Sequence, residues 1–326
     1  MTARVSKSQE SSLGSAPEKL ETDAYALAAN LPELLVEAHR VAQTITHGLH
    51  GRRRAGPGET FWQFRQFEQS DTAGAIDWRR SAASDHLFVR EHEWEAAHTV
   101  WIWLDISPSM GFQSHLGRST KADRAVVLGL AIAELLARGG ERVGLLGGRP
   151  WTGRLAPRRM AEALAQQAAE GGENSSLPPH SAISRFSECL LISDFLEPLD
   201  DMTPRFEQLA GQGVRGHLVQ VLDPAEETLP YSGRTEFTAS EGGDRVVAGR
   251  AESLREKYQA RITAHREALI AAARRMQWSF LLHHTDHPAE EALLALHAML
   301  AGIEADYRYR PGSETQMEVR GELIRP

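Results

Sequence analysis

An apolar run that ends in a group of oxygen-bearing side chains constrains this chain most. Residues 99–104 read Thr-Val-Trp-Ile-Trp-Leu, which predicts a strand covered on both faces of a sheet. Asp105, Ser107 and Ser109 follow directly, at positions i, i+2 and i+4. Ligands of open α/β sheets bind beyond the carboxyl ends of the strands, so these three side chains are candidates for one site. Oxygen ligands suit a hard cation such as Mg²⁺ or Mn²⁺.

The same residues also allow a purely structural interpretation. Asp, Ser and Pro are common in loops, and Ser107 or Ser109 could simply cap the next helix. A second acid, Asp194, also stands at the end of an apolar run, at residues 189–193. In a doubly wound sheet the first and third of these strands can end side by side, which would bring Asp194 to the serine loop. The pair of strand-end acids favours the metal hypothesis.

Strands and helices alternate through the rest of the chain. Further strands are expected at 142–147, 189–193, 217–222 and 278–283. Helices are expected at 120–138, 158–170, 203–210, 251–276 and 289–300. This order predicts an α/β domain with a doubly wound, mostly parallel sheet and helices on both faces. A β-hairpin at 235–239 and 245–247 is expected within an insertion at about 229–249.

The chain divides by composition into four expected regions. Residues 1–22 are expected to be a disordered tail, and 304–326 a charged tail. Residues 96–303 form the main domain. Residues 23–95 form a small N-terminal α+β extension that begins with an amphipathic helix at 23–45, expected to pack on the main body. Aromatic and paired charged residues at 61–82 fit either a small packed subdomain or a docking surface.

Composition excludes several classes of function. The net charge is −8, and the sequence contains no long run of basic residues, so nucleic-acid binding is not expected to be the main function. The single cysteine, Cys189, excludes internal disulfides and fits a reducing compartment. Because no apolar run reaches the roughly 18 residues of a membrane helix and no secretory segment opens the chain, we expect a cytoplasmic protein without a membrane span.

No P-loop or Gly-x-Ser-x-Gly elbow occurs, and residues 283–287, with three His and one Asp, are a weak zinc candidate.

Two groups of residues together resemble known families. Asp105-x-Ser107-x-Ser109 with Asp194, in this order of strands and helices, resembles a von Willebrand factor A-type domain with its metal-ion-dependent adhesion site. The segment from Arg65 to Ala82, which includes Ile-Asp-Trp-Arg, resembles the bacterial domain-of-unknown-function 58 (DUF58) family. The resemblance covers roughly residues 25 to 300.

The resemblance implies a binding module without enzymatic activity. In such domains Ser, Thr and Asp oxygens hold a Mg²⁺ or Mn²⁺ ion, and an Asp or Glu carboxylate of a protein partner fills its open position. Relatives are commonly encoded beside MoxR-type AAA+ ATPases, which implies an adaptor or co-chaperone role with such an ATPase. The chain departs from the pattern at Glu173, where a Thr is expected after Gly171-Gly172. Glu173 could itself bind the ion, Ser175 could substitute, or the site could be weakened or lost.

Two other functions remain open. Asp105 and Asp194 around one ion would also suit a Mg²⁺-dependent phosphoesterase. Against this, the first loop carries hydroxyls instead of a second carboxylate, and no nucleophile or base stands out. The third alternative is a structural scaffold whose metal site no longer functions, and Glu173 makes that alternative credible.

Overall fold

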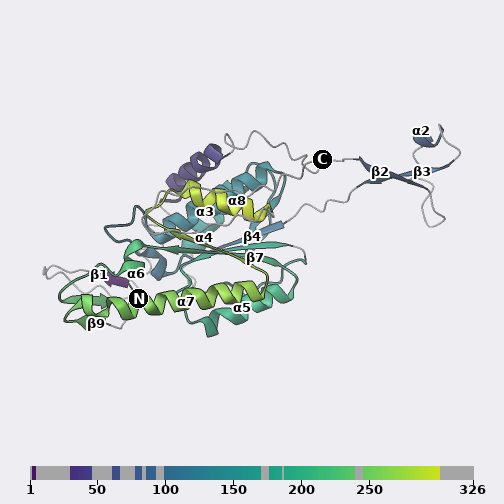
Figure 1. Cartoon of the computed structure of the whole chain (residues 1–326). Helices are drawn as coiled ribbons and strands as arrows, with labels where there is room; N and C mark the ends of the chain where they lie inside the picture. The colour runs from purple at the N-terminus through teal and green to yellow at the C-terminus, as the bar shows by residue number, and fades with distance from the viewer. Residues whose placement is uncertain are drawn as a thin grey trace, which may run out of the picture. The chain divides into compact units, whose positions relative to one another are not determined.

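A computed structural model provides the structure of the chain (Figure 1). It describes residues 2–4, 30–45, 61–66, 78–82, 86–92, 99–169, 176–185, 187–238 and 245–301. The chain separates into two compact units, of which the larger joins Met1–Gly51 to Thr99–Pro326 and the smaller is Arg52–His98.

The larger unit is built on a five-stranded parallel sheet. Its strand order is β10-β7-β6-β4-β5. The strands are β4 (Thr99–Leu104), β5 (Arg142–Leu145), β6 (Glu188–Ser193), β7 (Arg215–Leu222) and β10 (Ser279–His284). The prediction of an α/β fold with a mostly parallel sheet is confirmed. The strand order reverses between β4 and β6, so the expected crevice lies where these two strands end.

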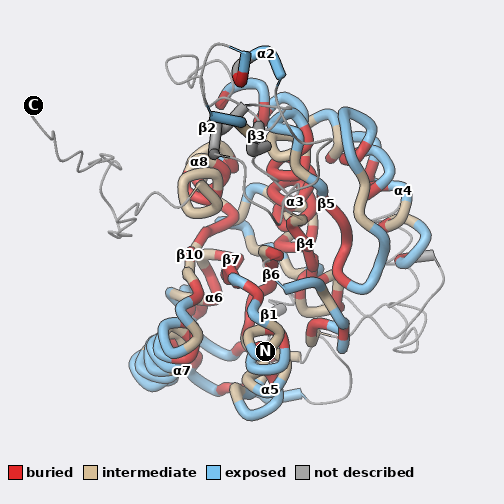
Figure 2. Tube along the Cα trace, turned by 90° about the vertical axis from the view of Figure 1, so that its right-hand side faces the viewer, coloured by how far each residue is buried: buried red, intermediate tan, exposed pale blue. Residues whose placement is uncertain are grey.

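Helices cover both faces of the sheet, as Figure 1 shows. On one face lie α3 (Lys121–Arg138), α4 (Ala156–Ala169) and α8 (Ala289–Leu300), and on the other lie α5 (Leu199–Gly211) and α7 (Arg255–Arg275). Successive β4 side chains alternate between the two cores, because strand residues point to opposite faces in turn. Ile102 packs with α3, whereas Trp101 and Trp103 pack with α5 and α7. Both cores are seen as buried segments in Figure 2.

The N-terminal helix is described over residues 30–45 and packs on the main body. Its apolar face joins the core formed by α3 and α8. Two polar contacts also link it to the main body: His39 Nδ1 lies 2.7 Å from Glu134 of α3, and Arg40 pairs with Glu290 of α8 at 3.3 Å. The helix therefore belongs to the larger unit. Residues 23–29 of the predicted helix lie outside the described residues.

A second, three-stranded sheet follows the end of β7. It has the order β1-β8-β9, with β1 at Thr2–Arg4, β8 at Thr235–Thr238 and β9 at Arg245–Ala248. β8 and β9 form the antiparallel pair predicted as a hairpin. The remainder of the tail expected to be disordered, residues 5–22, and the tail at 304–326 lie outside the described residues.

The smaller unit contains an antiparallel pair of strands and a short helix. β2 (Phe61–Gln66) pairs with β3 (Phe88–His92), and α2 spans Trp78–Ser81. Trp78 is 64% exposed, so this aromatic is not part of a core within the described residues. Residues 67–77, which hold the three acidic residues of the family-like segment, lie outside the described residues.

Several elements differ from the sequence predictions. α5 begins at Leu199 rather than Thr203, because Asp200 and Asp201 occupy its first turn, where acidic side chains complement the helix dipole. A short helix, α6 (Pro224–Thr228), was not expected, and the long helix expected at 251–276 opens with a 3-10 turn, η3 (Ala251–Leu254), before α7. Beyond β5, Trp151 forms one antiparallel bridge with Val143.

Candidate functional site

The loop after β4 turns its polar groups toward one another. The amide of Ser107 donates to Oδ1 of Asp105 at 2.8 Å, and the hydroxyls of Ser107 and Ser109 lie 3.1 Å apart. Ser109 sits in a 3-10 turn, η2 (Pro108–Gly111), whose N-cap is Ser107. Because the Ser107 side chain makes no capping hydrogen bond, the purely structural role considered for this hydroxyl is not seen.

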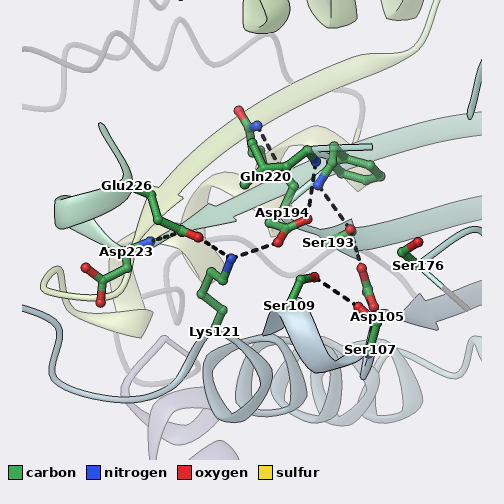
Figure 3. A network of polar contacts seen from close by, with 12 residues as sticks. Asp105, Ser107, Ser109, Lys121, Ser176, Ser193, Asp194, Gln220, Asp223 and Glu226 are labelled. Atoms are coloured by element: carbon green, nitrogen blue, oxygen red, sulfur yellow. Dashed lines mark hydrogen bonds and ion pairs between the residues drawn. The ribbon is translucent and has the colours of Figure 1, made fainter. Parts of the chain in front are cut away.

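The neighbouring strand β6 brings the second acid to this loop. β4 and β6 are paired, and the hydroxyl of Ser193 donates to Oδ2 of Asp105 at 2.6 Å. Asp194 follows, and its carboxylate interacts with the Ser109 side chain and accepts the Leu196 amide at 3.2 Å. The structure thus brings together Asp105, Ser107, Ser109 and Asp194 (Figure 3).

The remaining predicted ligands, Glu173 and Ser175, lie outside the described residues. Ser176, on the same loop, is described, and its hydroxyl donates to Oε1 of Glu197 at 2.9 Å.

A buried lysine that the sequence analysis missed completes the cluster. Nζ of Lys121 lies 2.7 Å from Oδ2 of Asp194 and 2.7 Å from Oε1 of Glu226, and its side chain has no exposed surface. Figure 3 shows the ammonium between the two carboxylates. One signal could have revealed it: Lys121 precedes Ala125 and Leu128 at helical spacing, so it lies on the buried stripe of α3.

Thr120 fixes the start of the helix that carries this lysine. Its side chain accepts the Asp123 amide at 3.0 Å, which is an N-cap interaction. The cap places Lys121 at the first helical position, close to the strand ends. The Phe112 ring, from the loop after Ser109, lies 6.0 Å from Nζ of Lys121.

The charges of the cluster are only partly compensated. Burial raises the pKa of Asp105 to about 6, and the nearby Asp194 adds to the rise, although hydrogen bonds from Ser107 and Ser193 oppose it. Burial also acts on Asp194, but the charge and hydrogen bond of Lys121 outweigh it and lower the pKa of Asp194. Among the residues that the structure describes, no Lys, Arg or His pairs with Asp105. Asp105 is therefore a buried carboxylate without a positive partner.

The same ammonium also serves Glu226. Burial raises the pKa of Glu226, and Lys121 offsets this only in part. For Lys121 itself, burial lowers the pKa, but Asp194 and Glu226 together raise it above its ordinary value. Lys121 is thus a permanent positive charge shared between two carboxylates.

The residues present fit a hard divalent cation. In the described part of the chain, no group of three or more His, Cys, Asp or Glu side chains could hold a metal ion. A cation would depend on the Ser107 and Ser109 hydroxyls together with Asp105 and Asp194, a set of oxygen ligands suited to Mg²⁺. The uncompensated charge of Asp105 is the observation that favours such an ion.

Asp223, at the end of β7, has a structural role instead. It accepts the Ser114 amide at 2.8 Å and the Ser114 hydroxyl at 2.5 Å. It also caps α6 by accepting the Ala225 amide at 2.9 Å, while Glu226 accepts the Asp223 amide at 3.0 Å. This capping box holds Glu226 against Lys121.

An apolar cavity of about 70 Å³ adjoins the cluster. Glu226 forms part of its wall, and most of its lining is aromatic or aliphatic: Phe112, Leu229, Tyr231, Phe237 and Tyr258. Glu226 therefore connects the cavity to Lys121, which in turn pairs with Asp194 of the oxygen cluster.

The adjacent residues His283 and His284 of the weak zinc candidate have separate surroundings. His284 forms an ion pair with Glu227 of α6. His283 is buried, and burial together with the charge of Arg124 on α3 lowers its pKa well below the ordinary value. Adjacent strand residues point to opposite faces, so the two rings do not converge on one ion.

None of the helices that the structure describes is both long and apolar enough to cross a lipid bilayer. Two solved structures share a distant likeness with the chain: conserved hypothetical protein BatB from Bacteroides thetaiotaomicron, and an aerotolerance-related membrane protein from Bacteroides fragilis NCTC 9343 with multiple mutations to serines. Each is 15% identical, with a TM-score of 0.35 over 63% of this chain and 99% of the other. At so low a TM-score the likeness carries no argument about fold or function.

Curated relatives include two mycobacterial proteins. Uncharacterized protein Rv1480 of Mycobacterium tuberculosis is 28% identical over 254 residues, which cover 74% of this chain and 79% of the relative. Uncharacterized protein Mb1516 of Mycobacterium bovis has the same identity and coverage. The family model described as "Protein of unknown function DUF58" matches residues 63–268. The chain therefore belongs to the DUF58 family.

Proposed function

We propose that this protein is a metal-ion-dependent, non-enzymatic protein-binding adaptor. The observation that carries the proposal is the convergence of Asp105, Ser107, Ser109 and Asp194 at the adjacent ends of β4 and β6. These oxygens surround a carboxylate that lacks a positive partner within the described residues. A divalent cation would compensate that charge, which supports a site of the von Willebrand factor A type on this sheet.

Each residue would have a distinct part in such a site. The Ser107 and Ser109 hydroxyls would bind the cation, and the carboxylates of Asp105 and Asp194 would bind it directly or through water. Ser193 and the Ser107 amide hold Asp105 in place from two sides. The bound cation would supply an open coordination position for an Asp or Glu carboxylate of the partner.

The partner proposed is a MoxR-type AAA+ ATPase in the cytoplasm, with this protein as its adaptor or co-chaperone. The support is membership of the DUF58 family together with the resemblance of the oxygen cluster to an adhesion-type site. A non-functional site is the competing proposal, since Glu173 stands where a Thr is expected.

Isothermal titration of Mg²⁺ and Mn²⁺ into the full chain tests the metal site. The wild type should bind one cation, Asp105→Ala should abolish binding, and Asp201→Ala, an exposed acid on α5, should leave it unchanged. Absence of binding by the wild type would support the scaffold alternative and overturn the proposal.

Partner binding and turnover test the rest of the proposal. A MoxR-type ATPase should bind the wild type in Mg²⁺ and lose binding in EDTA or with Asp105→Ala. A generic aryl phosphate should not be hydrolysed in the presence of Mg²⁺ or Mn²⁺. Turnover that Asp105→Ala abolishes would establish the phosphoesterase alternative instead.

A further inference from the structure

Lys121 is placed so that it acts on the cation site without being one of its ligands. Its ammonium lies 2.7 Å from Oδ2 of Asp194, the acid that β6 contributes to the proposed site. It lies at the same distance from Oε1 of Glu226, which belongs to α6 and to the wall of the apolar cavity. All three side chains are almost fully buried, so solvent screens their charges little.

Two opposing effects follow from this arrangement. The ammonium attracts the charge of Asp194 and repels any cation that approaches the same carboxylate, so it weakens cation binding. Glu226 attracts the same ammonium from the other side and offsets part of that repulsion. The affinity of the site then depends on how the lysine charge is divided between the two acids.

We propose that Lys121 is a built-in competitor that sets how tightly the site binds a divalent cation, with Glu226 as the positioning residue that moderates it. This inference rests on the proposed function, because it concerns the same site. It adds a residue pair that neither the motif nor the family resemblance includes.

The chain offers a matched control beside Glu226. Glu227 is the next residue of α6, but it pairs with Arg266 at 2.7 Å and with His284, and it does not contact Lys121. Glu226→Gln and Glu227→Gln therefore remove the same charge from adjacent positions, and only the first one changes the environment of the ammonium.

Titration of Mg²⁺ into the full chain, followed by calorimetry, measures the effect. Glu226→Gln should raise the dissociation constant about tenfold, the lower end of the range for residues behind a metal ligand. Glu227→Gln should change it by about twofold at most, because its ion pairs are partly exposed. Lys121→Met should act in the opposite direction and lower the dissociation constant, since it removes the competing charge.

The opposite signs separate this inference from a structural role. If Lys121 and Glu226 only maintained the fold of the site, both substitutions would weaken binding, and that result would overturn the inference. If the Lys121→Met variant does not fold, the comparison of Glu226→Gln with Glu227→Gln is sufficient as a test. Equal Mg²⁺ affinities of these two variants would reject the inference.

The outcome also separates the two proposals. In one outcome, Asp105→Ala abolishes cation binding, but Glu226→Gln and Glu227→Gln change the affinity equally. That outcome would support the adaptor proposal and reject the role of Lys121. Absence of any cation binding by the wild type would reject both.

Discussion

The hydroxyl of Ser193 donates a 2.6 Å hydrogen bond to Oδ2 of Asp105 and thereby joins the ends of two neighbouring parallel strands. The hydroxyl oxygen of Ser193 also accepts the amide of Phe195 at 3.1 Å. Phe195 has a φ of 47°, in the left-handed region, which costs a residue other than glycine about 1–3 kcal/mol. The turn after β6 is therefore held in a costly conformation at the point where Asp194 reaches the site.

Asp105→Asn should stabilise the metal-free protein. The carboxamide oxygen can still accept the Ser107 amide and the NH₂ group can donate to the Ser193 hydroxyl, so that the second bond reverses its direction, while the substitution removes a buried charge that has no positive partner within the described residues. In EDTA at pH 8 we expect a gain of about 1–3 kcal/mol in the free energy of unfolding, measured by urea denaturation.

The gain should depend on pH in a defined direction. The pKa of Asp105 is raised from 3.8 to about 6, so ionisation of this carboxyl destabilises the folded state. The destabilisation reaches its full size only above about pH 6. Below pH 4 the carboxyl is protonated in both states, and the two proteins should converge. Asp201→Asn, at an exposed acid on α5, should show no such gain, and a loss of stability in Asp105→Asn at pH 8 would contradict the argument.

The sequence predicted the sheet and the four-residue cluster because both depend on local patterns. Continuous apolar runs marked β4 and β6, and each ended in an acid. The rule that ligands bind where the strand order reverses then placed Asp105 near Asp194, as the pairing of the two strands confirms.

The sequence did not predict Lys121 because its partners come from distant parts of the chain. Asp194 follows it by 73 positions and Glu226 by 105, and no spacing rule links such residues. α6 was not predicted either: Asp223, at the end of β7, caps a five-residue helix and binds Ser114. A short helix of this kind leaves no periodic pattern.

Lys121→Met should strongly destabilise the metal-free protein. It leaves Asp194 and Glu226 buried without their shared cation, and breaking a buried pair in this way costs about 3–5 kcal/mol. Urea denaturation in EDTA measures the loss. Adding Asp194→Asn and Glu226→Gln to the same chain should restore most of it, because no buried charge then remains unpaired in this trio.

An exposed lysine gives the control for that measurement. Lys257→Met, on the solvent side of α7, should change stability by no more than about 0.5 kcal/mol. A single Lys121→Met variant as stable as Lys257→Met would show that the buried ion pairs contribute little, and the account of the cluster would have to change.

His217 should make the protein sensitive to mild acid. Burial lowers the pKa of its ring from 6.5 to about 4, and the charge of Arg215 adds to this. Nδ1 lies 2.7 Å from the Ser279 hydroxyl, but Glu188 is 3.9 Å from Nε2, too far for a hydrogen bond that would stabilise the charged ring. The folded protein therefore holds His217 neutral where the unfolded chain protonates it.

That difference destabilises the fold as the pH falls from 6.5 to about 4. Below pH 4 the full effect is roughly 3 kcal/mol. His217→Gln removes the titrating ring, so the wild type should lose more stability than this variant across the window, as measured by thermal unfolding at successive pH values. Parallel stability curves for the two proteins would exclude His217 as the source of acid sensitivity.

Gly216 of β7 allows a close contact that a methyl group would abolish. A Cβ atom there would lie 2.0 Å from the Trp278 ring, which is held by a 3.2 Å hydrogen bond from its indole nitrogen to the Val214 carbonyl and packs on Phe206. Since the ring cannot retreat without losing both contacts, Gly216→Ala should reduce the free energy of unfolding by about 1–3 kcal/mol in urea denaturation. Gly211→Ala, at the open end of α5, should be neutral or stabilise by up to about 1 kcal/mol, because a Cβ meets nothing there and the unfolded chain loses entropy. Equal effects of the two substitutions would mean that the indole yields, and that the contact between β7 and Trp278 does not fix the core on the α5 and α7 face.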